Sequence, residues 1–146
     1  VGVVSLLFFI HLVGGLFRKR LEGDVLQRFA NASILRKDMW ANYFGRKQKG
    51  MGQIRGNGAL VLTDCRLWFM LAAPRTEIDI PLSRITHFGT TRSHLGKSIL
   101  RPLLLVEFDT PEGPDSIAWA LRDTDGWVKA IDLAWKNAQE SQPALK

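Results

Sequence analysis

The chain begins with an uninterrupted apolar stretch. Residues 1–17 contain no charged side chain, and the basic residues Arg18, Lys19 and Arg20 follow at once. As a helix, this stretch would span roughly 25 Å, which is at the short end of what a bilayer crossing needs. We interpret residues 1–17 as a transmembrane anchor and residues 18–21 as a basic juxtamembrane junction.

Two other interpretations of the apolar stretch stay open: a cleaved signal peptide and a buried or interfacial helix. A signal peptide is disfavoured because no basic residues precede the stretch and no small-residue cleavage site follows it. The basic cluster on its C-terminal side places the rest of the chain in the cytoplasm by the positive-inside rule. The single cysteine, Cys65, fits a reducing compartment. We therefore expect a single-pass membrane protein with a cytoplasmic soluble domain.

From residue 56 onward, short apolar or alternating runs are separated by turn residues, which is typical of strands. The clearest alternation is in residues 77–82, where Ile78 and Ile80 point one way and Glu77 and Asp79 the other. Pro81 near the end of this run favours an edge strand or a strand terminus. Strands are predicted over residues 58–63, 66–71, 77–82, 85–91, 103–108 and 116–121.

The C-terminal part changes to a helical period. Apolar residues recur from Trp127 through Ile131 to Trp135, with charged residues on the opposite side, and Thr124 is a plausible N-cap. We predict a mainly β, α+β domain over residues 22–140. It would be a bent antiparallel sheet or partial barrel of about seven strands, closed by this amphipathic helix with two tryptophans as its seal, and followed by a tail over residues 141–146.

The pattern is least readable between residues 22 and 57. The segment from Val25 to Ser33 fits a strand and a helix about equally, and residues 46–57 are glycine-rich and basic, which indicates a mobile loop.

Charge is concentrated directly after the apolar stretch. The net charge is +6, and residues 18–55 carry ten basic and three acidic side chains. Residues 56–146 are close to neutral, whereas a nucleic-acid-binding domain would be expected to show a basic face across its folded part. We therefore expect anionic lipid headgroups, with a membrane protein as a possible further partner, and no nucleic acid.

No motif predicts catalysis, a metal site or a cofactor. Gly96-Lys97-Ser98 is similar to the end of a phosphate-binding P-loop, but Pro102 follows where the motif needs a helix. His87 and His94 lack accompanying ligands at metal-binding spacing. We expect a binding protein and not an enzyme.

Two segments together carry a family resemblance. Gly58-Ala-Leu-Val-Leu-Thr-Asp-Cys-Arg-Leu-Trp-Phe, followed by Glu77-Ile-Asp-Ile-Pro-Leu-Ser-Arg-Ile85, resembles the GRAM family of pleckstrin-homology-like (PH-like) domains, and Trp127 is similar to a tryptophan often found in the closing helix. The resemblance covers roughly residues 22–140. It implies a binding module, whose ligand in that group is a phosphoinositide, another anionic lipid or a protein.

The resemblance also suggests which cations bind phosphate. In PH-like domains, the connection after the first strand often carries them. Here the candidates for headgroup binding are Arg36, Lys37, Arg46, Lys47, Lys49 and Arg55. The alternative is that these residues serve only topology and solubility beside the membrane.

A membrane-interface set is predicted as well: Arg18, Lys19, Arg20, Trp40 and Tyr43. Trp40 and Tyr43 belong to a cluster with Met39 and Phe44 that could equally pack onto the domain core. The function we expect is a membrane-anchored module that contacts anionic headgroups. The alternative is a scaffolding domain that docks a membrane protein without lipid specificity.

Overall fold

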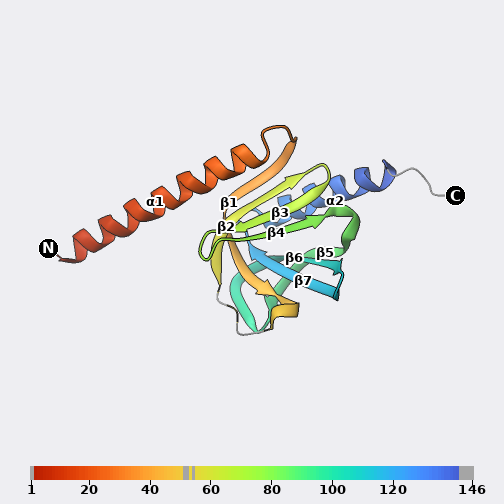
Figure 1. The fold of residues 1–146 in the computed structure, drawn as a ribbon. Helices are drawn as coiled ribbons and strands as arrows, with labels where there is room; N and C mark the ends of the chain where they lie inside the picture. Colours follow the sequence, from red (N-terminus) through yellow and green to blue (C-terminus); the bar gives the residue numbers. More distant parts are fainter. Residues whose placement is uncertain (1, 51–52, 54, 142–146) are drawn as a thin grey trace.

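The apolar stretch is part of a longer helix that continues into the domain. The computed structural model describes residues 2–50, 53 and 55–141, so most of the predicted tail lies outside the described residues. Helix α1 (Gly2–Arg28) has 27 residues and no break at the basic cluster (Figure 1). At 1.5 Å per residue its length is about 40 Å. The helix is long and apolar enough to cross a membrane.

Seven antiparallel strands form one bent sheet, which confirms the predicted fold class. In chain order they are β1 (Ile34–Arg46), β2 (Gly56–Thr63), β3 (Arg66–Leu71), β4 (Thr76–Pro81), β5 (Ile85–His94), β6 (Lys97–Thr110) and β7 (Gly113–Ala120). The order across the sheet is β4-β3-β2-β1-β7-β6-β5. Two single turns of 3-10 helix, η1 (Lys47–Lys49) and η2 (Leu82–Arg84), follow β1 and β4. Strand β4 lies at a sheet edge and ends at Pro81, as its sequence predicts.

Strand β1 joins the two halves of the sheet and is the strand that the sequence pattern did not predict. It pairs with β2 along its first part and with β7 along its second. Register shifts interrupt the pairing with β2 between Asp38 and Ala41, and the pairing with β7 between Tyr43 and Arg46. Gly45 adopts a φ of 106° at this second shift, a backbone conformation that glycine tolerates best. Such bulges bend a strand, and here the bend turns the sheet.

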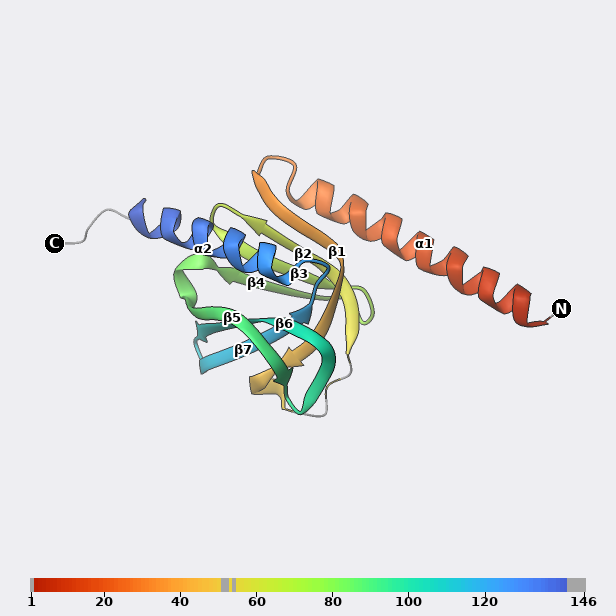
Figure 2. The ribbon, with the colours of Figure 1, turned by 180° about the vertical axis from the view of Figure 1, so that it is seen from behind.

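Helix α2 (Thr124–Glu140) closes one end of the bent sheet, which confirms the predicted role of its tryptophans (Figure 2). Trp127 is 2% exposed in the main core. Trp135 packs against that core and donates its indole N–H to the Ile85 carbonyl at 3.3 Å. The predicted N-cap, Thr124, was wrong by one residue: the carboxylate of Asp123 accepts the Gly126 amide.

The last third of α1 packs on the outer face of the first half of the sheet. Leu21, Val25 and Phe29 are buried there at four-residue spacing, together with Ala59, Val61, Trp68 and Met70. The Phe29 and Trp68 rings meet edge to face, with their centroids 5.1 Å apart. An ion pair between Asp24 and Arg75 borders the contact. The segment from Val25, which fitted a helix and a strand equally well, is therefore helical as far as Arg28.

Candidate functional site

One end of the domain brings together two exposed lysines, Lys47 and Lys49, and the partly exposed Lys97. We call it the loop end: the last residues of β1, the described part of the β1–β2 connection, and the β5–β6 turn at Leu95 and Gly96. A ring nitrogen of His94 lies 2.9 Å from the Gly45 carbonyl oxygen, and Lys97 donates to the Gln53 carbonyl at 2.8 Å. These contacts hold the two connections side by side.

Gln53 organises the β1–β2 connection. Its side-chain amide donates to the carbonyls of Arg46 and Gly50, at 2.6 Å each. Its side-chain oxygen accepts the Arg46 amide at 3.0 Å and the Tyr43 hydroxyl at 3.1 Å. The loop predicted to be mobile is therefore tied back to β1, at least through its described residues.

Lys47 and Lys49 are exposed cations of the loop end, as is Arg55. The two lysines lie on η1. Within the described part of the chain, neither ammonium group has an ion-pair or hydrogen-bond partner. Sequence reasoning did not include Lys97 among the headgroup cations, because Gly96-Lys97-Ser98 was tested for a P-loop and then set aside as a turn between strands. The ammonium group of Lys97 lies at the same end, against Gln53.

At the loop end, two of the predicted headgroup cations are engaged within the protein. Arg46 donates to the fully buried carboxylate of Asp115 at 2.7 Å. Arg55 donates to the Asn42 side chain, and its guanidinium carbon lies 4.2 Å from the centre of the Phe44 ring. These contacts indicate that the two arginines position the loop end.

The structure does not bring Arg36 and Lys37 to the loop end, because they lie near the opposite end of β1. Arg36 pairs with Asp123 at 2.7 Å, and its guanidinium lies over the Trp127 ring. The Gly126 amide, and after it the Arg36 guanidinium, hold the pKa of Asp123 below its ordinary value. Arg36 thus fastens the start of α2 to β1, while Lys37 is exposed.

The predicted interface residues divide between surface and core. Arg18, Lys19 and Arg20 are exposed on α1, and Trp40 is 41% exposed with the Arg18 guanidinium 5.3 Å from its ring centre. Tyr43 is buried and stacks on Phe69, and burial raises its pKa. Core packing was the alternative open for Tyr43, and we leave this residue out of the proposed interface.

His94 does not add to the charge of the loop end at neutral pH. It is buried, and burial lowers its pKa below the ordinary value. The cationic character of this end therefore comes from lysine and arginine. In the described residues, no group of three or more His, Cys, Asp or Glu could hold a metal ion.

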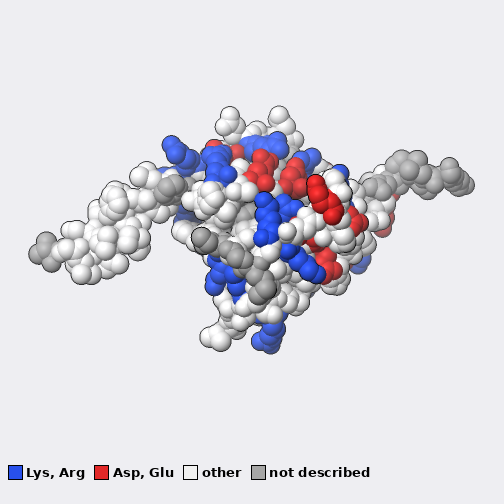
Figure 3. All heavy atoms as spheres, turned by 60° about the horizontal axis from the view of Figure 1, so that its bottom comes forward, with Lys and Arg blue, Asp and Glu red and all other residues white. Residues whose placement is uncertain are grey.

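The loop end lies on the half of the domain away from the C-terminal end of α2. In Figure 1 the β3–β4 turn lies on the side of α1, the β1–β2 and β5–β6 connections lie at the bottom of the view, and the end of α2 lies at the upper right. In Figure 3, Lys and Arg side chains border the base of α1 together with a few acidic ones, and most of the visible Asp and Glu side chains lie farther from it. The direction of α1 therefore fixes where the cations face.

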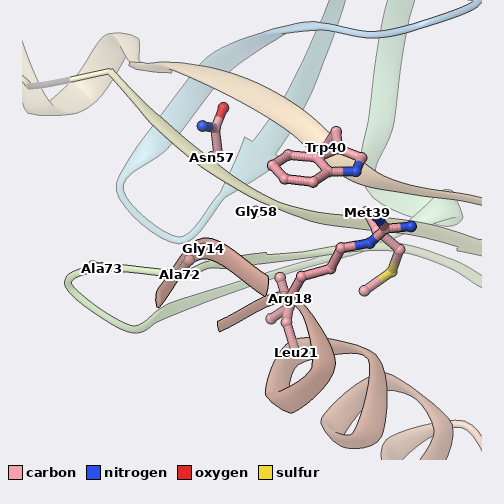
Figure 4. Close-up of a pocket in the computed structure, with 9 residues that line it drawn as sticks. All are labelled: Gly14, Arg18, Leu21, Met39, Trp40, Asn57, Gly58, Ala72 and Ala73. Carbon is pink, nitrogen blue, oxygen red and sulfur yellow. The ribbon is translucent and has the colours of Figure 1, made fainter. Parts of the chain in front are cut away.

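An apolar groove runs between α1 and the sheet. We call it the α1 groove; it has a volume of about 270 Å³. Its walls come from α1, from β1, from the start of β2 and from the β3–β4 turn (Figure 4). The lining residues are Gly14, Arg18, Leu21, Met39, Trp40, Asn57, Gly58, Ala72 and Ala73.

Comparisons with known proteins show the fold and no closer relationship. No family model matches the sequence, and no curated protein matches it. Among solved structures, the C-terminal domain of an unknown protein from Leishmania infantum is 17% identical, with a TM-score of 0.54 over 85% of this chain and 98% of that one. The N-terminal PH domain of Vps36 is 15% identical, with a TM-score of 0.54 over 77% of this chain and 85% of that one.

A chain of the 8S snRNP assembly intermediate is similar to the same degree. It is 13% identical, with a TM-score of 0.54 over 75% of this chain and 84% of that one. Identities this low carry the fold and not the ligand. The domain that follows the apolar half of α1 therefore has a PH-like fold.

Proposed function

We propose that the protein is a membrane-anchored, non-enzymatic PH-like module, of the GRAM type that its motifs resemble, that contacts anionic lipid headgroups at the cytoplasmic face. The first part of α1 is the anchor, and the basic cluster at residues 18–20 sets the orientation. The cations that meet the leaflet are Lys47, Lys49 and Lys97. Arg46 and Arg55 position the loop end, and Arg36 lies outside the contact.

The observation that carries this proposal is the continuity of α1. The helix has no break between its apolar part and the buried residues Leu21 and Val25, which dock it on the sheet. An anchor joined to its domain in this way directs the loop end toward the leaflet. A flexible linker would leave that orientation open.

The energetics favour a weak contact. Each cation near an anionic leaflet contributes on the order of 1 kcal/mol, and salt reduces this value. Because the anchor already holds the domain at roughly millimolar effective concentration near the headgroups, weak contacts are enough to orient it.

Reversing two charges at the loop end tests the lipid role. The full chain is placed in nanodiscs of phosphatidylcholine with or without phosphatidylserine, and hydrogen exchange of the β1–β2 connection is measured. We expect phosphatidylserine to slow exchange there about tenfold in the unchanged chain, because bound headgroups oppose local opening. Lys47→Glu with Lys49→Glu should abolish the effect.

The control pair is Arg84→Glu with Lys129→Glu, which makes the same change in net charge at exposed positions on η2 and α2. It should leave the phosphatidylserine effect intact. If the unchanged chain shows no effect of phosphatidylserine, the lipid role is excluded and the scaffolding alternative becomes the better account.

A further inference from the structure

We propose that the α1 groove is a phospholipid site: one acyl chain lies in the groove and the lipid phosphate meets Arg18. This inference rests on the proposed anchoring of α1. It is separate from the loop end, because Lys47, Lys49 and Lys97 do not line the groove.

The position of the groove along α1 points to a lipid. Gly14 lies within the apolar stretch, and Arg18 is the first charged residue after it. A spanning helix changes from hydrocarbon to headgroup surroundings at this level. The groove therefore continues the apolar surface of α1 and ends beside a cation. An occupant that matches both features is apolar along its length and anionic at one end.

Small residues on two sides of the groove leave room in it. A Cβ atom built on Gly14 would meet nothing within 4 Å. Gly58, Ala72 and Ala73 form the facing wall, and the last two belong to the β3–β4 turn. The sheet and the helix approach each other here without filling the space between them.

The polar groups of the groove are suited to a headgroup. The Arg18 side chain lies over the half-exposed ring of Trp40, and Glu22 pairs with it on an exposed face. Tryptophan and arginine are both favoured at the boundary between headgroups and hydrocarbon, where one part of the side chain is wet and the other apolar. A phosphate on the open side of Arg18 would complete this arrangement.

Adjacent glycines on α1 provide a matched test. Gly14→Leu places a side chain in the groove, and Gly15→Leu adds the same apolar volume at a position that does not line it. Both substitutions raise helix propensity and hydropathy equally, so insertion of α1 should not distinguish them. Neither meets a steric obstacle at Cβ.

The readout is photolabelling of the full chain in nanodiscs of phosphatidylcholine that contain phosphatidylserine with a diazirine on its acyl chain. We expect labelled peptides at Met39–Trp40 and at Ala72–Ala73. Gly14→Leu should reduce that labelling about tenfold, which corresponds to about 1.4 kcal/mol of lost binding. Gly15→Leu should leave it unchanged. Equal labelling in both variants, or no label on these peptides, would overturn the proposal.

Two accompanying measurements separate this inference from the proposed function. Alkaline extraction of membranes shows first whether α1 is inserted; release of the protein would overturn the anchoring, and the lipid site with it. Lys47→Glu with Lys49→Glu should leave groove labelling unchanged. An inserted chain with headgroup contact at the loop end and no groove labelling would overturn the groove site alone.

Discussion

Replacing Asp115 by alanine is expected to lower the free energy of unfolding by about 3 kcal/mol, because it leaves a mostly buried guanidinium without its partner. The Asp115 carboxylate is fully buried and accepts from the Arg46 side chain and from the amides of Gln48 and Ser116. Urea denaturation of the full chain in detergent micelles, followed by near-ultraviolet circular dichroism, measures the loss.

The effect should extend to the candidate site. Gln48 lies between Lys47 and Lys49 on η1, so the carboxylate that holds its amide also positions both lysines. Asp115→Asn is the graded control, because it keeps a hydrogen-bond acceptor and loses the charge. It should lower the free energy of unfolding by less than Asp115→Ala does. A loss below about 1 kcal/mol for Asp115→Ala would place this pair among the weak surface pairs and contradict its role.

The second large effect is expected at the contact between α1 and the sheet. Val25 is 1% exposed, and Val25→Asp would place an unpaired charge there. Burying that charge costs more than the contact contributes, so the last third of α1 should leave the sheet. Hydrogen exchange of residues 21–28 should accelerate about a hundredfold, which corresponds to roughly 3 kcal/mol of lost burial.

Leu26→Asp is the matched control, because Leu26 is adjacent on the same helix and 62% exposed. It should change exchange in residues 21–28 by less than threefold, since surface substitutions usually stay within about 0.5 kcal/mol. Equal acceleration by both variants would show that helix propensity, and not docking, sets the protection.

Local patterns predicted the elements whose periodicity is regular. The β2–β3 hairpin and α2 lie close to where alternation and helical spacing placed them. Gly58, part of the motif that suggested the family, also has a local reason: a Cβ atom there would clash with the Met70 carbonyl oxygen. Only glycine allows β3 to approach β2 at this point.

Strand β1 could not be predicted in the same way. Its bulges move residues from one face to the other, so a period of two does not persist along its length. The docking of α1 did leave a signal, the four-residue spacing of Leu21, Val25 and Phe29. That spacing alone did not decide the structure, because the segment from Val25 fits a strand as well as a helix.

The candidate site was predictable where it is local in sequence and not where it depends on distant contacts. Lys47 and Lys49 were identified because they are close together in a basic run. Lys97 joins them only through the folded β5–β6 turn, and Arg46 is engaged by Asp115, far along the chain. Pairings of this kind follow from the bend in the sheet, which no local pattern encodes.

The orientation of the domain against the membrane is the central claim, and the two ends of β3 test it most directly. Native Cys65 is exposed in the β2–β3 turn, and Ala73 is exposed in the β3–β4 turn beside the α1 groove. β3 has six residues, which separates the two turns by about 20 Å. Two labelled proteins are compared: in one, a fluorescent dye is attached to native Cys65, and in the other, the same dye is attached at position 73 of the double variant Cys65→Ser, Ala73→Cys. Both are placed in vesicles that contain doxyl lipids, which quench fluorescence at shallow depth. The account predicts strong quenching at position 73 and little at position 65; equal quenching at both, or stronger quenching at Cys65, would contradict it.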